Sequence, residues 1–146
     1  MRGKVVAVCT SANKGERKTN VGRAEMVPGM GLAGDAHAGF VHRQVSLLAM
    51  ESIDKMRRKG LDVGPGDFAE NITTEGLELA SLPVGTRLKI GGALLEVSQI
   101  GKKCHARCAI YQQAGDCVMP KEGIFAIVVA GGLVAVGNGI EVTANV

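Results

Sequence analysis

The chain has 146 residues and a formal net charge of +3, with its basic residues dispersed. A chain of this length buries a hydrophobic core without staples, so we expect one domain over residues 1–146. Aromatic residues make up only 3% of the chain and tryptophan is absent, which disfavours a surface that stacks nucleic-acid bases. No apolar run approaches the ~20 residues needed to cross a bilayer, and the N-terminus lacks a signal-peptide pattern. We therefore predict a cytoplasmic protein with neither nucleic-acid nor membrane partners.

Glycines separate the apolar runs of this sequence without forming a fixed repeat, and there are 21 of them. Such punctuation is typical of a small β-barrel with tight turns. The first run, residues 3–10 (GKVVAVCT), predicts a strand and places Cys9 in the core. Four cysteines without an export signal indicate a reducing compartment, in which free thiols are favoured over disulfides.

A glycine-rich segment, GLAGDAHAGFVHRQVSLL, follows at residues 31–48. Its glycines surround Asp35 and His37, and His42 and Arg43 lead into an apolar run. Such a segment brings backbone amides close to a ligand and offers one carboxylate and two imidazoles. The structural alternative is that Asp35 fixes a turn and that the histidines are hydrogen-bonded scaffold groups.

Residues 46–60, SLLAMESIDKMRRKG, predict a helix inserted between strands. Leu48 or Ala49, Ile53 and Met56 recur at helical spacing. Basic residues crowd the last turn and a glycine follows, as is typical of a helix C-terminus.

The segment GDFAENITTEG, residues 66–76, is a polar loop. Its Asn71 either caps a strand end or donates from its amide to a ligand oxygen, and Thr73 adds a hydroxyl. Composition alone does not choose between these roles.

Two later segments predict hairpins. Residues 86–97 (TRLKIGGALLEV) place apolar runs around Gly91-Gly92, and residues 123–142 repeat this pattern around Gly131-Gly132 before a last strand. With the first strand, they predict a mainly β fold, an antiparallel β-barrel with one or two inserted α-helices.

Three of the four cysteines lie in GKKCHARCAIYQQAGDCVM, residues 101–119. Cys104 is flanked by lysine and His105, and Cys108 follows Arg107. Neighbouring cations favour the thiolate, which is the form that accepts a sulfane sulfur. Residues four apart share a face of a helix and also of a strand, so a second thiol would lie near the first. The pattern therefore favours a reactive thiol at Cys104 or Cys108.

A zinc site is the main alternative for this segment. Its ligands would be Cys104, His105, Cys108 and Cys117, which are suitable ligand types but match no common zinc-knuckle spacing. Cys117 otherwise acts as a resolving thiol or a buried turn residue. We therefore predict no metal site.

Four stretches of the chain, taken together and in order, resemble the MOSC domain, the module named for the C-terminal part of molybdenum-cofactor sulfurase. They are GLAGDAHAG…RQVSLLAMESID, GDFAENITTEGLELASLPVGTRLKIGGALLEV, IGKKCHARCAIYQQAGDCVMPKEGIFAIV and GGLVAVGNGIEV. The resemblance covers residues 4–142 and is closest to the small stand-alone bacterial form. The family's frequent Gly-Asp near the last strand is Gly137-Asn138 here, a turn in which Asn replaces Asp well.

The resemblance implies a barrel of the MOSC type, similar to the pyruvate-kinase barrel, and an association with molybdenum cofactor (molybdopterin). It also implies a cysteine that carries sulfur as a persulfide, and the family pattern fits Cys108 slightly better than Cys104. Arg43 matches the family's basic position, and Asn71 matches the polar position of its GEN stretch, written here Ala69-Glu70-Asn71. Lys121 is a weaker candidate. The expected cofactor-binding residues are Arg43, Asn71, His37, Asp35, Thr73, His105 and Arg107.

The implied function is a sulfur carrier that delivers sulfur to a molybdenum centre. Pyridoxal phosphate belongs to the desulfurase domain of fused relatives, for which this chain has no room, so a separate cysteine desulfurase would load the sulfur. The other expected partner is a cofactor-biosynthesis enzyme or a molybdoenzyme. The protein would then be a sulfurtransferase-type carrier and not a complete enzyme. The alternatives are a cofactor-binding module without persulfide chemistry, a domain linked to reductases of N-hydroxylated substrates, and a structural zinc-binding domain.

Overall fold

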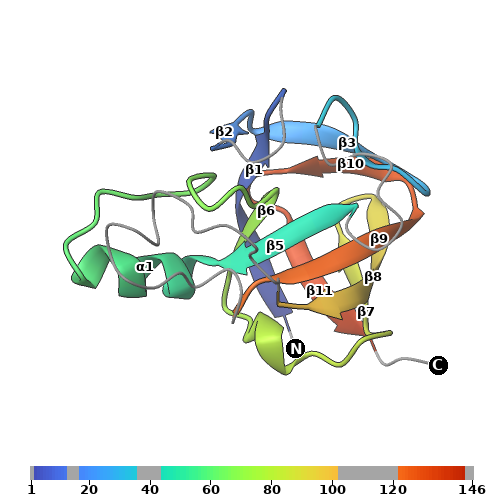
Figure 1. Ribbon diagram of the computed structural model, residues 1–146. Coiled ribbons are helices and arrows are strands. Elements are labelled where there is room, and N and C mark those ends of the chain that lie inside the picture. Colours follow the sequence, from blue (N-terminus) through green and yellow to red (C-terminus); the bar gives the residue numbers. More distant parts are fainter. Residues whose placement is uncertain (1, 13–16, 36–43, 102–121, 144–146) are drawn as a thin grey trace.

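The computed structural model describes residues 2–12, 17–35, 44–101 and 122–143 of the chain. Strands dominate these residues, and one α-helix projects from them (Figure 1). The elements are β1 (Arg2–Thr10), β2 (Thr19–Asn20), β3 (Arg23–Val27), β4 (Gly31–Leu32), β5 (Val45–Ala49), α1 (Met50–Arg58), β6 (Ile72–Glu75), the 3-10 helix η1 (Leu79–Ser81), β7 (Arg87–Ile90), β8 (Ala93–Ile100), β9 (Ile124–Ala130), β10 (Gly132–Ala135) and β11 (Gly139–Thr143).

Seven strands close a barrel in the order β11-β7-β8-β9-β5-β6-β1, and β1 returns to β11. The closing pair is antiparallel and sets Arg2 opposite Glu141. The mainly β barrel predicted from the sequence is therefore confirmed, with one difference in strand direction. Strands β5 and β6 are parallel. A crossover connection is needed between parallel neighbours, and α1 lies in that connection.

Helix α1 is shorter than the sequence predicted. Residues 45–49 form β5 because this stretch is buried on both faces, which suits a strand between two apolar layers. Ile53 and Met56 are buried on α1, as their helical spacing predicted. Gly60 ends the helix at φ +93°, and its N–H donates to the Arg57 carbonyl at 2.9 Å.

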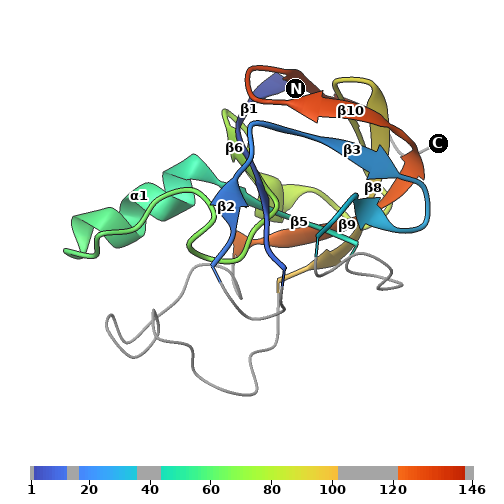
Figure 2. The same cartoon turned by 90° about the horizontal axis from the view of Figure 1, so that it is seen from above.

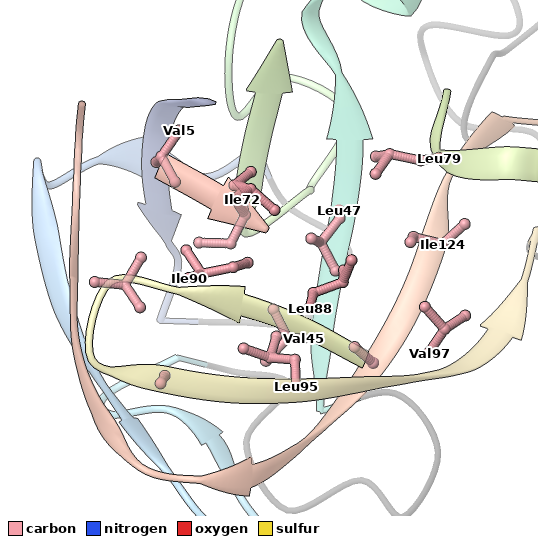
Figure 3. Close-up of a cluster of buried hydrophobic side chains, with 14 of the residues drawn as sticks. Val5, Val45, Leu47, Ile72, Leu79, Leu88, Ile90, Leu95, Val97 and Ile124 are labelled. Carbon is pink, nitrogen blue, oxygen red and sulfur yellow. The ribbon is translucent and has the colours of Figure 1, made fainter. Parts of the chain in front are cut away.

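Alternation along the strands fills the barrel with apolar side chains. On β5, Val45 and Leu47 point into the barrel, whereas Leu48 packs against α1 in a second cluster that includes Phe125. Figure 3 shows Leu47 near Leu88 in the interior, with side chains from facing strands around them. Each fully buried leucine contributes about 2 kcal/mol of transfer free energy, so this interior is the main source of stability.

A smaller sheet, in the order β10-β3-β4, lies against one side of the barrel (Figure 1). The hairpin predicted at Gly91-Gly92 is confirmed as β7–β8. The hairpin predicted at Gly131-Gly132 is wrong, because β9 pairs with β8 and β5 while β10 pairs with β3. The chain instead turns a tight corner here. A side chain at Gly132 would overlap the Gly92 backbone, and the Gly92 N–H donates to the Leu133 carbonyl at 3.1 Å.

Candidate functional site

The candidate site residues that the structure describes gather around the C-terminal end of β1. Asn71 donates from Nδ2 to the Cys9 carbonyl at 3.1 Å, and the Ser11 N–H donates to Asp35 Oδ1 at 3.1 Å. The two predicted polar segments, 31–48 and 66–76, therefore meet at neighbouring residues of one strand end. Figure 2 shows this end beside β2 and the loop that leads from α1 to β6.

Asn71 joins β5 to β1 at the point where β6 begins. Its Oδ1 accepts from the Ser46 N–H at 2.9 Å and from the Ser46 hydroxyl at 3.1 Å. Its backbone N–H donates to the Ser46 carbonyl at 2.9 Å, and its carbonyl accepts from the Cys9 N–H at 2.6 Å. The side chain is fully buried, so Asn71 has the strand-capping role that the sequence offered as one of two.

Glu70 is a buried carboxyl next to Asn71. It accepts from the Thr73 hydroxyl at 2.7 Å and from the Phe68 N–H at 3.3 Å. Burial is the largest influence and raises the pKa of Glu70, while the hydrogen bond from Thr73 and those from backbone amides lower it less. Ala69, where the family pattern has glycine, adopts φ 61°, a left-handed conformation that favours glycine. The Thr73 hydroxyl thus donates a hydrogen bond to Glu70 in the protein interior.

Lys18 and Asp35 form a buried ion pair. Their Nζ and Oδ1 atoms are 2.8 Å apart, and both side chains have 0% exposure. Lys18 Nζ also donates to the Ser11 hydroxyl at 3.0 Å. An ammonium carries three N–H groups, and these two acceptors are its partners among the described residues. Asp35 therefore does more than fix a turn, because it neutralises a buried cation.

The loop before β6 contacts the backbone of Lys18. The Lys18 N–H donates to the Gly66 carbonyl at 2.8 Å. Gly66 has φ +91°, and a Cβ there would overlap the Lys18 carbonyl and lie 3.3 Å from Cys9 Sγ. Only a glycine fits this close approach. Gly66 therefore allows the loop of residues 59–71 to pack against Lys18, the residue before β2.

Cys9 is a buried thiol, as the first strand predicted. Burial, and secondarily the carboxyl of Glu70, raises its pKa to about 12, while Lys18 lowers it to a smaller extent. A thiol with this pKa is protonated at neutral pH and is a poor nucleophile.

The remaining predicted residues lie outside the described part of the chain. They are His37, His42, Arg43, Cys104, His105, Arg107, Cys108, Cys117 and Lys121. Within the described ranges, no group of three or more His, Cys, Asp or Glu side chains is arranged to hold a metal ion. The same ranges contain no helix with the length and apolarity to span a membrane.

Sequence reasoning missed Lys18, Glu70 and Ser46. Lys18 is the last residue of a charged run, GERK, that has the composition of a solvated loop, so its burial had no local signal. Glu70 had a weak signal, because it lies between Phe68-Ala69 and Ile72 in a stretch that leads into a strand. Ser46 could have been found only through its pairing with Asn71 across the parallel strands.

The family of the chain follows from its sequence match. Residues 34–141 match the family model of the MOSC domain, and these residues include Asp35, Glu70 and Asn71. The chain belongs to the MOSC domain family. This family is associated with molybdenum-cofactor sulfurase-like function.

Several solved structures share the fold of this MOSC domain. YuaD from Bacillus subtilis is 22% identical with a TM-score of 0.82, covering 97% of this chain and 96% of that chain. YiiM from Escherichia coli is 25% identical with a TM-score of 0.71, covering 100% of this chain and 71% of that chain. YiiM from Geobacillus stearothermophilus is 20% identical with a TM-score of 0.75, covering 97% and 75%. A comparison with curated proteins finds no match for this chain.

Proposed function

We propose that this MOSC domain is a sulfur carrier in which Cys108, with Cys104 as the other candidate, holds a persulfide destined for a molybdenum centre. The proposal is supported by family membership together with the cation-flanked cysteine pair of residues 101–119. Cys9 differs from Cys104 and Cys108 in its surroundings. Cys9 is buried with a pKa of about 12, so it does not compete for sulfur.

Loading is a transfer of sulfane sulfur between two cysteines. The thiolate of Cys108 attacks the terminal sulfur of a persulfide on a separate cysteine desulfurase. A new S–S bond forms on Cys108, and the bond to the desulfurase cysteine breaks so that this cysteine leaves as a thiolate. No net oxidant or reductant is needed.

Release uses the second thiol when the sulfur is not passed on directly. The thiolate of Cys104 attacks the inner sulfur of the persulfide and hydrosulfide leaves. The two cysteines end as a disulfide, so the electrons that reduce the sulfane sulfur come from this pair. Cys104 is thereby the resolving thiol in this scheme.

The expected donors for an anionic cofactor follow Asp35 in the sequence. Molybdenum cofactor carries a phosphate and oxo groups, which favour cationic and amide donors. Lys18 is not such a donor, because its ammonium is fully buried and is paired with Asp35 and the Ser11 hydroxyl. Arg43 and His37, which follow Asp35 in the sequence, would hold the cofactor's anionic groups, and the cofactor would supply the metal centre that receives sulfur.

Intact-protein mass spectrometry tests the carrier function. The protein is incubated with a cysteine desulfurase and free cysteine, and we expect one added sulfur atom that reductant removes. Replacing both Cys104 and Cys108 by Ser should abolish the gain, and the single variants should identify the carrier. The control variant Cys9→Ser should still gain sulfur.

Two results would contradict the carrier. Zinc that co-purifies stoichiometrically and blocks alkylation of Cys104, Cys108 and Cys117 together would establish the zinc-binding alternative. Molybdenum cofactor that still binds the double Cys→Ser variant, with no sulfur gained by the wild-type protein, would establish a binding module.

A further inference from the structure

A stripe of charged residues follows the solvent side of α1. Its members lie three or four positions apart, which is the spacing of one helix face: Glu51, Asp54, Lys55 and Arg58. Three of them are exposed, and Asp54 is partly exposed. Along the helix, two acids are followed by two bases. The helix runs outward from β5, so the basic end of the stripe lies farthest from the barrel (Figure 1).

This order of charges is complementary to itself. If two copies of α1 cross antiparallel at the midpoint of the stripe, Glu51 of one copy faces Arg58 of the other. A two-fold axis repeats this contact, and Asp54 faces Lys55 in the same way. Glu51 and Arg58 lie about 10.5 Å apart along the helix axis, or two turns, so all of these contacts form in one short crossing.

A groove beside the first half of α1 offers a binding place for the basic end of a second copy. It has a volume of about 510 Å³ and lies between α1 and the segment that joins β6 to η1. Its charged lining comprises three carboxylates and one ammonium, from Glu51, Glu78, Glu122 and Lys55. The groove is therefore net negative. The helix dipole alone explains acids at the start and bases at the end of a helix, but it does not explain this acidic groove.

Internal hydrogen bonds hold two of the carboxylates in place. The Ser52 hydroxyl and the Lys55 ammonium both donate to Glu122 Oε1, at 2.8 and 2.9 Å. Glu51 Oε2 accepts from the Gly76 N–H at 2.9 Å. Within the described ranges, the second oxygen of each carboxylate has no hydrogen-bond donor, so it is able to accept from a guanidinium.

Arg58 suits the groove because its side chain combines a charged end with an apolar stem. No salt bridge to Arg58 occurs in the part of the chain that the structure describes. Leu77 and Leu79 also line the groove, and the stem would pack against them. Exposed ion pairs contribute little affinity, so the charges set the orientation of the crossing and the association should be weak.

We propose that α1 is a two-fold dimerisation surface, on which the basic end of the helix in one copy binds the acidic groove beside the start of the helix in the other. The partner is therefore a second copy of this chain. The proposal uses no residue assigned to sulfur transfer, so it and the proposed function can fail separately.

Sedimentation velocity of the full chain tests the proposal, with reductant present to prevent disulfide-linked dimers. We expect a monomer–dimer equilibrium with a dissociation constant on the order of 100 µM at low salt. Raising the salt concentration from about 0.05 M to about 0.5 M should weaken the dimer at least about fivefold, because salt screens exposed charges. A protein that stays monomeric up to about 1 mM would overturn the proposal.

Charge reversal at either end of the stripe tests the antiparallel geometry. Glu51→Arg and Arg58→Glu each place like charges opposite one another, so each variant alone should dimerise at least about tenfold more weakly. An equimolar mixture of the two variants again sets opposite charges face to face. It should therefore form a heterodimer with an affinity within about threefold of the wild-type dimer. A mixture that associates no better than its components would overturn the proposal.

The matched control is Arg23→Glu, which makes the same change of net charge at an exposed position of β3, in the smaller sheet. Because β3 takes no part in the crossing, this variant should dimerise within about twofold of the wild type. A loss as large as that of Arg58→Glu would show that net charge governs association, and it would overturn the assignment of the interface to α1.

Discussion

The barrel interior and the cluster at the end of β1 are both withdrawn from solvent, but they are built from opposite kinds of side chain. Inside the barrel, Leu47 and Leu95 and their neighbours are apolar and interlock by alternation along the strands. At the end of β1, Lys18, Asp35 and Asn71 are polar and bond one another or the backbone.

The two regions therefore differ in how many sequences they tolerate. Apolar contacts are non-directional, so the interior accepts many sequences of similar volume. A buried polar group lowers the free energy of unfolding unless it has a hydrogen-bond partner. The cluster at the end of β1 therefore accepts few substitutions. The adjacent segment, residues 36–43, contains the predicted ligands His37 and Arg43.

The largest effect is expected at Asn71. Replacing Asn71 by Ala leaves the Ser46 N–H and the Cys9 carbonyl buried without their side-chain partner. Because each orphaned group costs about 1–3 kcal/mol, we expect the free energy of unfolding to fall by about 4 kcal/mol, measured by urea denaturation. Asn138, whose Oδ1 accepts from the Ala135 N–H in a partly exposed turn, is the control, and Asn138→Ala should cost about 1 kcal/mol. Equal losses at the two asparagines would show that the buried bonds of Asn71 contribute no more than a hydrogen bond in a partly exposed turn.

In the interior, Leu47→Ala should cost about 3 kcal/mol through lost burial and a residual cavity. Leu47 has 0% exposure and points into the barrel (Figure 3). The exposed Leu133, at 54%, gives the comparison, and Leu133→Ala should change stability by less than about 0.5 kcal/mol. A replacement Leu47→Met should recover most of the loss because volume is conserved, whereas Asn71→Asp should recover little. Recovery at both positions would show that the polar cluster is as tolerant as the core.

The pH dependence of stability should come partly from Glu70. Burial raises the pKa of Glu70 above its ordinary value of 4.5. The folded protein then keeps a proton that the unfolded chain releases, so this contribution is full below pH 4.5 and decreases as pH rises towards the folded pKa. Across that interval the free energy of unfolding should fall by about 1.4 kcal/mol per pH unit. Glu70→Gln should remove this slope, and an unchanged slope in the variant would show that Glu70 is ionised in the folded state.

The smallest effect tests a polar group inside the apolar region. Thr74 lies on the same face of β6 as Ile72, and its Oγ1 has no hydrogen-bond partner in the part of the chain that the structure describes. Thr74→Val keeps the shape and removes the unpaired hydroxyl, so we expect a gain of about 1 kcal/mol in thermal and chemical denaturation. The matched change Thr73→Val, which breaks the bond to Glu70, should instead destabilise the protein. A loss at Thr74 would indicate that the hydroxyl is satisfied.

The strands were predictable from the sequence because apolar runs bounded by glycines report local structure. The Gly91-Gly92 hairpin and the buried Cys9 follow from such local patterns. Strand pairing was less predictable. Gly131-Gly132 has the same local pattern as a hairpin, but the corner there depends on the approach of the distant Gly92 backbone. The parallel β5–β6 pair similarly depends on the path of α1.

Part of the candidate site was also predictable. Asp35 and Asn71 stand out as polar residues beside glycines and apolar strands, and the structure brings both to the end of β1. The burial of Lys18 was not predictable, since a lysine within a charged run normally remains in water. Its burial depends on the loop before β6, whose Gly66 approaches the lysine backbone.

The seam between β1 and β11 has a consequence for how the protein is made. Among the described strands, β1 is synthesised before all the others and pairs with β11, which is synthesised after all the others, so Arg2 must find Glu141 across a long sequence separation. Until residues 139–143 emerge, the facing edges of β1 and β7 present unpaired N–H and C=O groups that invite intermolecular pairing. Contacts of such long sequence separation also slow folding. The barrel therefore stays an open sheet until β11 is synthesised, and it closes only when this strand is free to pair.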